Sequence, residues 1–188
     1  MSLIDRRTFL SLFPLTGACA QTAGKKRRDP DVPYVPTTEP AVQAMLKLAG
    51  VTKNDIVYDL GCGDGRIVVA AAKLGARGVG IDINPERIKE ANANAKQAGV
   101  EKLVRFEEND LFQADIHEAT VVTMFLLPAI NLKLKPKLLK DLKPGTRLVS
   151  NTFDMGDWKA EKETTLETGS DEDISGLSYR FYLWRVPG

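Results

Sequence analysis

Cysteine and histidine are scarce in this sequence, and their scarcity removes several kinds of chemistry. The 188 residues contain two cysteines, Cys19 and Cys62, and a single histidine, His117. Two cysteines so far apart provide neither a disulfide framework nor the spacing of a metal site. One histidine leaves no room for a zinc cluster or for a mechanism that uses two imidazoles. The sequence therefore predicts no metal site.

Long apolar runs and a strong net charge are lacking as well. No run approaches the roughly 20 apolar residues that a membrane-spanning helix needs. The formal net charge is +1, but residues 1–28 carry six basic residues against one acid, whereas residues 29–188 carry 20 basic and 24 acidic residues. On charge alone, this longer part of the chain is not a nucleic-acid binder. The length suits one domain, and a hydrophobic content of 43% suffices for a normal core.

Residues 1–20 are similar to an export signal rather than to part of a fold. Arg6 and Arg7 stand before a short apolar stretch, as in twin-arginine signals. Residues 18–20 fit a cleavage site, while residues 15–19 are similar to a lipobox that would make Cys19 a lipidated N-terminus. Both endings stay open, and so does the alternative of an irregular N-terminus on a cytoplasmic protein.

The boundaries of the folded part follow from this interpretation. We expect export to the periplasm or the cell envelope, with a possible lipid anchor at Cys19 and no stable membrane span. Residues 21–32, which include four consecutive basic residues, form a flexible charged linker. Residues 33–188 form the single folded domain.

Apolar strands alternate with helices through this domain. The pattern predicts strands at residues 56–60, 78–82, 103–107, 120–127 and 147–153, and helices at residues 38–50, 67–74, 84–98 and 128–142. We expect Pro136 to interrupt the last helix. Residues 178–186 alternate apolar and polar positions, which is typical of a closing antiparallel hairpin. Five β-α units followed by a hairpin describe an α/β, doubly wound sheet with an antiparallel edge.

A glycine-rich turn, residues 59–66 (DLGCGDGR), links the first of these strands to its helix. Glycines let the backbone bend sharply and approach a ligand closely. A dinucleotide site would have a third glycine where Arg66 stands, and a P-loop would end in Gly-Lys-Ser/Thr. The turn is therefore poorly suited to a pyrophosphate, which the carboxylate of Asp59 would also repel.

The spacing of Asp59, Gly61, Gly63 and Gly65 resembles motif I of the class I S-adenosylmethionine-dependent methyltransferases. The resemblance implies a Rossmann-like mixed sheet with the strand order 3-2-1-4-5-7-6 and a C-terminal antiparallel hairpin. It also implies S-adenosyl-L-methionine as the cofactor, with the glycine loop under its methionine part and Asp59 near its amino end. A carboxylate beside a ligand that carries an ammonium and a sulfonium is electrostatically sensible.

Acids at the next two strand ends complete the cofactor site that the resemblance implies. Asp82 matches the residue that holds both ribose hydroxyls, because a carboxylate can accept two O–H bonds. Asp110 matches the position that binds the adenine amino group, and Ile83 and Leu111 would flank the ring. Other residues near the turn have simpler interpretations: Asp64 as a helix cap, Cys62 as a small packing residue and His117 as an exposed, inert side chain.

Further segments resemble a family of protein-lysine methyltransferases that act on the ATP synthase c-subunit and the adenine nucleotide translocase. They are residues 33–37 (PYVPT), 63–68 (GDGRIV), 110–112 (DLF), 125–128 (FLLP) and 145–150 (GTRLVS), with Phe153 and Trp158. This resemblance implies a lysine of a protein as the acceptor, and a membrane-embedded protein is one candidate. The sequence departs from the family in carrying Asp82 where relatives can carry Glu, and in its export signal.

The acceptor pocket is expected to involve Tyr34, Pro36, Phe125 and Pro128. Aromatic faces could hold a methylammonium or a sulfonium group by cation–π contact, although ordinary packing is the alternative for Tyr34 and Phe125. No residue stands out as a general base, so we expect catalysis by positioning and desolvation.

Several alternatives stay open at this point. The fourth strand lacks the Asn/Asp-Pro-Pro-aromatic ending of enzymes that methylate amide or base nitrogens, which argues against such acceptors. Five lysines in residues 133–143 could attract an acidic partner or lipid headgroups, or could simply form a solvated helix face. A small-molecule methyltransferase and an exported S-adenosylmethionine-binding protein without turnover are the other candidate functions.

Overall fold

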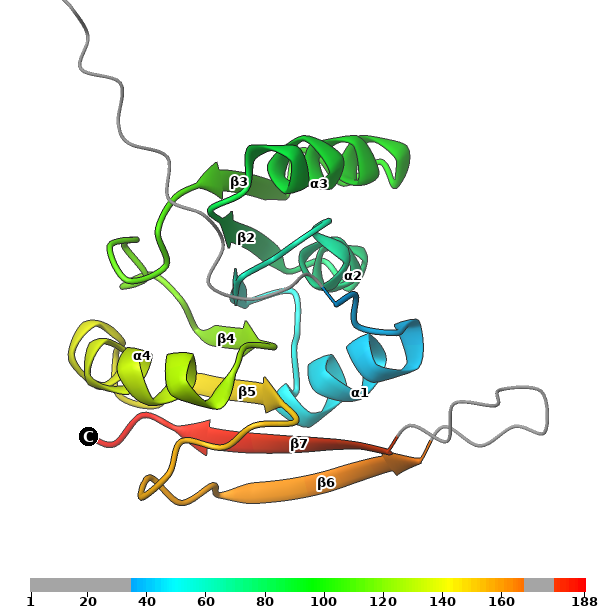
Figure 1. The fold of residues 1–188 in the computed structure, drawn as a ribbon. Coiled ribbons are helices and arrows are strands. Elements are labelled where there is room, and N and C mark those ends of the chain that lie inside the picture. Colours follow the sequence, from blue (N-terminus) through cyan, green and yellow to red (C-terminus); the bar gives the residue numbers. More distant parts are fainter. Residues whose placement is uncertain (1–34, 168–177) are drawn as a thin grey trace, which may run out of the picture.

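One seven-stranded sheet organises the chain, in the order β3-β2-β1-β4-β5-β7-β6 (Figure 1). The structure, a computed structural model, describes residues 35–167 and 178–188. The predicted signal and linker and the acceptor candidate Tyr34 lie outside the described residues. The parallel strands are β1 (Ile56–Leu60), β2 (Arg77–Asp82), β3 (Val104–Glu108), β4 (Val121–Met124) and β5 (Arg147–Asn151).

The antiparallel edge consists of β6 (Lys162–Glu167) and β7 (Ser178–Arg185), with β7 pairing to both β5 and β6. The predicted class, strand order and closing hairpin are therefore confirmed. Four consecutive residues of β7, Phe181 to Trp184, are buried. The strand is thus covered on both faces along this stretch, although its sequence alternates.

Helices cover both faces of the sheet (Figure 1). On one face, α1 (Glu39–Ala49) and α2 (Arg66–Lys73) pack against alternate residues of β1, β4 and β5, and α3 (Pro85–Gln97) packs beside α2. On the other face, Leu134 and Leu138 of α4 (Pro128–Asp141) share a core with the remaining residues of these strands. Burial on both faces explains why the central strands are almost wholly apolar.

Three predicted features of the fold are wrong. The fourth strand ends at Met124 instead of residue 127. No helix connects β3 to β4, because residues 109–120 form only turns, in which the buried side chains of Ala114 and Ile116 fill the space against the sheet. The five repeated β-α units are therefore incomplete.

The third wrong prediction concerns Pro136, which lies inside a continuous α4. A proline removes the helical hydrogen bond to the carbonyl four residues before it. That carbonyl belongs to Leu132, and both Leu132 and Pro136 lie on the exposed side of α4. Water can therefore replace the missing donor, and the helix continues.

The parallel strands β1 to β5 end at one edge of the sheet, which is where open α/β sheets bind ligands. Loops from β1, β2, β3 and β4 meet there, and the segment that leads into α1 reaches the same edge. Across residues 35–167 and 178–188, no helix combines the length and apolarity that a membrane crossing requires.

Candidate active site

A cavity of about 500 Å³ lies at this carboxyl edge. Its volume is in the range of sites for small organic ligands. Most of the predicted site residues line it: Pro36, Asp59, Gly61, Asp82, Ile83, Asp110, Leu111 and Phe125. Gly63, Gly65 and Pro128 do not. The structure thus brings together residues from four loops and from the segment before α1.

The glycine turn is shaped by bonds to the end of β2. The backbone N–H groups of Gly61 and Cys62 both donate to the carbonyl of Ile81, at 2.8 and 2.9 Å. Gly61 has a φ of 80°, and a Cβ there would lie 2.9 Å from a side-chain carbon of Leu126. Only glycine lets the turn pass this close to the floor of the cavity without strain.

Gly65 has a different role from that of Gly61. It is the N-cap residue of α2 with a φ of 76°, and a Cβ there would lie 2.6 Å from the Phe106 ring and 2.8 Å from Ala91. The glycine therefore allows the turn to pack tightly on β3 and α3. Gly65 therefore contributes to the packing that holds the turn in place and does not line the cavity itself.

Asp82 accepts hydrogen bonds from the glycine turn and also lines the ligand cavity. Its Oδ2 accepts the N–H of Gly63 and its Oδ1 accepts the N–H of Asn84, both at 2.9 Å. A carboxylate has about four acceptor positions, so each oxygen can still accept an O–H bond. Two vicinal hydroxyls of a ribose match this arrangement.

The loop after β3 forms the neighbouring wall. Asp110 Oδ1 accepts the backbone N–H of Phe112 at 2.9 Å, and the N–H of Asp110 donates to Asn109 Oδ1 at 2.9 Å. These bonds fix the loop, and Leu111 and Ile83 add apolar surface to the same cavity. A flat aromatic base with an exocyclic amine suits a wall of this composition.

Asp59 is the buried charge of the site. It is 3% exposed, and the hydroxyl of Thr123, its partner in the β1–β4 register, donates to Oδ1 at 2.8 Å. Burial raises the pKa of Asp59 to about 7, against the effect of the Thr123 bond and with a smaller contribution from the negative charges of Asp82 and Asp64. A cationic group bound in the cavity would stabilise the ionised form of this carboxyl.

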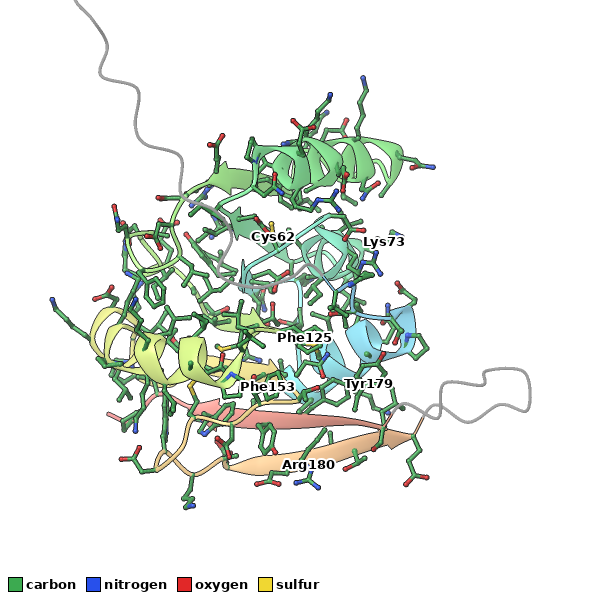
Figure 2. The ribbon with its side chains drawn as sticks, viewed as in Figure 1. Cys62, Lys73, Phe125, Phe153, Tyr179 and Arg180 are labelled. Atoms are coloured by element: carbon green, nitrogen blue, oxygen red, sulfur yellow. The ribbon has the colours of Figure 1, made fainter. Side chains whose placement is uncertain are left out.

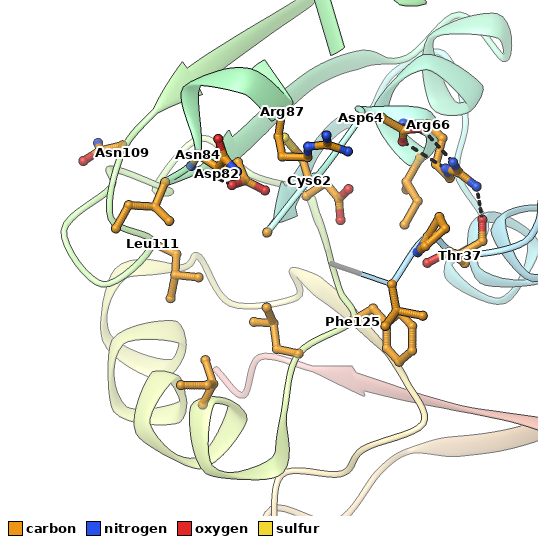
Figure 3. A pocket seen from close by; sticks show the side chains of 18 of the residues that line it. Thr37, Cys62, Asp64, Arg66, Asp82, Asn84, Arg87, Asn109, Leu111 and Phe125 are labelled. Atoms are coloured by element: carbon orange, nitrogen blue, oxygen red, sulfur yellow. Dashed lines mark hydrogen bonds and ion pairs between the residues drawn. The ribbon is translucent and has the colours of Figure 1, made fainter. Parts of the chain in front are cut away.

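The opposite end of the cavity combines apolar side chains with the Asp64–Arg66 ion pair and is called the apolar end below. Val35 and Pro36 precede α1, Phe125 and Leu126 follow β4, and Ile130 lies in the first turn of α4. Figure 3 shows Thr37 and Phe125 on one side of the cavity and Asn109, Asn84 and Leu111 on the other. Figure 2 places Phe125 and Cys62 on the same edge of the sheet. The cavity therefore has a polar end and an apolar end.

Several lining residues were missed by the sequence reasoning. Asn84, Arg87, Asn109 and Phe112 contribute to the polar end, and Val35, Thr37 and Ile130 to the apolar one. Val35, Thr37 and Phe112 lie in segments that carry the family resemblance. The others have no such signal and reach the cavity because a neighbour in sequence does. Arg66 also lines the cavity, at the position of the missing third glycine.

Asp64, Cys62 and His117 each have partners or surroundings that define their roles. The N-cap residue of α2 is Gly65, while Asp64 accepts the N–H of Arg66 at 3.3 Å and forms an ion pair with its guanidinium. Cys62 is 5% exposed, and burial raises the pKa of its thiol well above the usual range. His117 is exposed beside Asp115. Packing for Cys62 and exposure for His117 agree with expectation.

The residues present fit S-adenosylmethionine. Asp82 offers two acceptors for a ribose, the Asp110 loop offers an adenine site, and Asp59 offers a buried carboxylate for a cation. At Gly61 a Cβ would lie 2.9 Å from the Leu126 side chain, which itself lines the cavity, so glycine is required where the turn meets the ligand site. This donor set matches a nucleoside that carries an amino acid and a positive sulfur.

Comparisons with known proteins agree with this fit. Residues 59–162 match the ANTKMT methyltransferase domain family. A Saccharolobus islandicus protein named protein-lysine N-methyltransferase is 52% identical over 159 residues, which cover 84% of this chain and 95% of that protein. The human lysine N-methyltransferase of the ATP synthase c-subunit is 31% identical over 133 residues, covering 71% of this chain and 57% of its own length. The chain thus spans little more than half of this human relative.

A solved structure is similar over most of the fold. The Salinibacter ruber protein, described as an RNA methyltransferase and crystallised with S-adenosyl-L-homocysteine, is 51% identical with a TM-score of 0.75. The match covers 81% of this chain and 94% of that one. The carboxyl-edge cavity and these similarities lead to one conclusion: the chain belongs to the ANTKMT methyltransferase domain family and is an S-adenosylmethionine-dependent methyltransferase.

Proposed function

We propose that this enzyme methylates a lysine side chain of a protein. The observation that carries the proposal is the apolar end of the cavity, where Val35, Pro36, Phe125 and Ile130 add apolar surface to the same cavity as Asp59. Relatives named as lysine methyltransferases support the same acceptor class.

The apolar end suits the chemistry of a lysine acceptor. When bound, S-adenosylmethionine supplies an electrophilic methyl group on a sulfonium. A free lysine has a pKa of about 10.4, and an apolar surrounding lowers it by penalising the ammonium. Leu126 and Ile130 add apolar surface to this cavity, and Phe125 presents a ring that can hold a methylammonium product. Alignment of the amine with the methyl group then contributes most of the rate.

Transfer of a labelled methyl group tests this proposal. Purified protein is incubated with tritiated S-adenosylmethionine and an extract of the source cells, and the labelled products are separated and hydrolysed. Methyl-lysine in protein hydrolysates is the expected result, and the Asp82→Asn variant serves as the control for cofactor-dependent label. Label in RNA, as the description of the Salinibacter protein suggests, would overturn the lysine acceptor.

The other outcomes distinguish the remaining candidates. Label in small molecules alone indicates a small-molecule methyltransferase, and binding without any labelled product indicates a cofactor-binding protein. The excess of acids over bases in residues 29–188, 24 against 20, disfavours an RNA backbone as partner.

A membrane-embedded acceptor is our narrower proposal. Leu132 and Leu139 on α4 are 50% and 38% exposed, and Lys133 and Lys140 follow them in sequence. This face combines apolar and basic side chains, as do surfaces that rest on anionic membranes. The test is to compare label in detergent-solubilised membrane proteins with label in soluble ones, and label confined to the soluble fraction contradicts it.

We also propose that the chain is exported, on the basis of residues 1–20 alone. Fractionation of cells that express the full chain tests this, with Arg6→Lys, Arg7→Lys as the paired signal variant. A cleaved or lipid-labelled product outside the cytoplasm is expected, and loss of lipid label in Cys19→Ser would favour the lipobox ending. An uncleaved cytoplasmic product contradicts export.

A further inference from the structure

Arg66 links two walls of the cavity that the sequence places 29 positions apart. It is the first residue of α2 and follows directly on the glycine turn. Both oxygens of Asp64 are engaged: Nε donates to Oδ1 at 2.9 Å and an Nη donates to Oδ2 at 2.6 Å. This forked pairing fixes the plane of the guanidinium.

The other terminal nitrogen of Arg66 points away from the turn. It donates to the carbonyl oxygen of Thr37 at 2.7 Å, and Figure 3 shows this bond reaching the segment before α1. Bonds with a charged donor are about twice as strong as neutral ones. Thr37 is only 5% exposed, whereas the Arg66 side chain is 34% exposed, so water has access to this bond from the arginine side alone.

The segment that Arg66 holds leads into α1 and has no regular secondary structure of its own among the described residues. Residues 35–38 form no helix or strand, and Pro36 has no N–H to donate. Val35 is 58% exposed, yet Val35, Pro36 and Thr37 all line the cavity. A wall of this kind keeps its place only if a firm contact holds it.

The base on which Arg66 stands is itself rigid. The carbonyl of Asp64 accepts a bond from the side chain of Asn94 on α3 at 2.9 Å, and Gly65 packs against Phe106 and Ala91. The turn is therefore fixed to α3 and β3 before Arg66 extends toward Thr37. Through Arg66, the rigid cofactor loop therefore fixes the position of the Val35–Thr37 segment at the apolar end.

We propose that Arg66 is a positioning residue that holds the Val35–Thr37 segment against the cavity, so that the acceptor side of the transfer site is in place when the cofactor loop is. The inference rests on the proposed function for its acceptor, but the positioning itself is a property of the chain. It explains why an arginine stands where a dinucleotide-binding turn requires glycine: the position is used for a cross-link between walls.

The direct test measures the mobility of the segment. A nitroxide is attached at Val35→Cys in a chain that carries Cys19→Ser, and the buried Cys62 is left in place. We expect Arg66→Met to sharpen the spectrum of the label, and Arg66→Lys to restore part of the immobility, since a lysine reaches one acceptor but cannot form the fork. An unchanged spectrum in Arg66→Met overturns the proposal, whatever the acceptor proves to be.

Arg105→Met is the matched control. Arg105 also pairs with a carboxylate, Glu107 at 2.9 Å, and with a neutral oxygen, the Tyr58 hydroxyl at 2.9 Å, and it does not line the cavity. The label should stay immobile in this variant. If Arg105→Met loosens the segment as much as Arg66→Met does, the effect is a general loss of stability and the proposal is wrong.

Kinetics give the second measurement. Arg66→Met should lower kcat for methyl transfer to membrane-fraction protein about tenfold, because a displaced wall misaligns the acceptor. The KM for S-adenosylmethionine and the Kd for S-adenosylhomocysteine by calorimetry should change less than threefold. A loss of cofactor affinity as large as the loss of kcat would place Arg66 in cofactor binding instead. Absence of transfer in the parent enzyme contradicts the lysine proposal and leaves the nitroxide result standing.

Discussion

Two buried carboxyls at opposite ends of one strand behave in opposite ways. Asp55 stands just before β1 and is 6% exposed, and Asp59 stands near its other end and is 3% exposed. Burial alone would raise the pKa of Asp55, but bonds from the Thr120 hydroxyl and the Thr52 N–H and the charge of Arg147 lower it below the usual value. The pKa of Asp59 is raised to about 7.

The difference lies in the partners that each carboxyl has. Asp55 accepts bonds from the N–H and hydroxyl of Thr52 at 2.8 and 3.1 Å, from the Thr120 hydroxyl at 2.7 Å, and pairs with Arg147. Asp59 has the Thr123 hydroxyl, and its charged neighbours named above are acids. At the amino edge of the sheet, the charge of Asp55 is thus compensated within the protein. At the carboxyl edge, the charge of Asp59 is compensated only when a cationic ligand binds.

Asp55→Ala should have the largest effect, and it should be on stability. Removing one member of a buried ion pair leaves Arg147 uncompensated, at a cost of about 3–5 kcal/mol in the free energy of unfolding. Urea denaturation measures this value. Asp157→Ala, which breaks an exposed pair with Lys135, is the control and should leave the urea midpoint close to that of the parent. If both variants lose a similar free energy of unfolding, the Asp55–Arg147 pair does not stabilise the fold more than an exposed pair does, and the contrast between Asp55 and Asp59 is wrong.

Asp82→Asn should have the next largest effect, and it should be on binding. An amide keeps one acceptor for the turn but loses the charge that strengthens bonds to hydroxyls, by about 1.5–3 kcal/mol. We expect about a 100-fold weaker Kd for S-adenosylhomocysteine by calorimetry. Unchanged affinity would remove Asp82 from the cofactor site.

Asp82→Ala would be a poorer test than Asp82→Asn. The alanine also leaves the N–H groups of Gly63 and Asn84 without their acceptor. Any loss of binding would then combine a missing ligand contact with a distorted turn. The two bonds were not foreseen from the sequence, which predicted a residue that contacts the ribose alone.

The sequence was most informative where a residue type is forced by geometry. The glycine turn at Gly61, the apolar β4 and the proline at the start of α3 each have a local signature, so these elements and the cofactor edge could be predicted from the residues. The strand order followed only from the family resemblance. The connection between β3 and β4 could not be predicted, because residues 109–120 form irregular turns, whose buried side chains Ala114 and Ile116 follow no helical or strand period. The bond from Arg66 to Thr37 could not be predicted either, because the two residues are 29 positions apart in the sequence.

The pH dependence of ligand binding is the third test, and it concerns Asp59. Between about pH 4 and pH 7 the folded chain holds a proton on Asp59 that the unfolded chain has lost, so this group lowers stability as the pH rises through that window. A cationic ligand favours the ionised carboxyl. The affinity for S-adenosylhomocysteine should therefore fall about tenfold from pH 8 to pH 6.

Asp59→Asn separates this group from other titrations. The variant should bind S-adenosylhomocysteine weakly at both pH values, without the tenfold change, and should resist urea better than the parent at pH 8. Asp55 behaves in the opposite sense, because a lowered pKa contributes stability above the unfolded value of about 3.9 that is lost on acidification. If Asp59→Asn keeps the full tenfold pH dependence of binding, a group other than Asp59 causes that dependence.

The smallest effects should come from two phenylalanines that line opposite ends of the cavity, one affecting the acceptor and the other the cofactor. Phe125 follows β4 at the apolar end, whereas Phe112 follows Leu111 at the polar end and carries the ammonium of Lys133 over its ring, 4.5 Å from the centroid. Phe125→Ala should lower kcat/KM for the acceptor about fivefold, the value of one cation–π contact of about 1 kcal/mol, with the Kd for S-adenosylhomocysteine within twofold of the parent. Phe112→Ala should do the reverse, weakening cofactor binding a few-fold and sparing the acceptor. Equal effects of both variants on both ligands would mean that the two ends are one continuous apolar lining, and that the polarity of the cavity comes from its carboxylates alone.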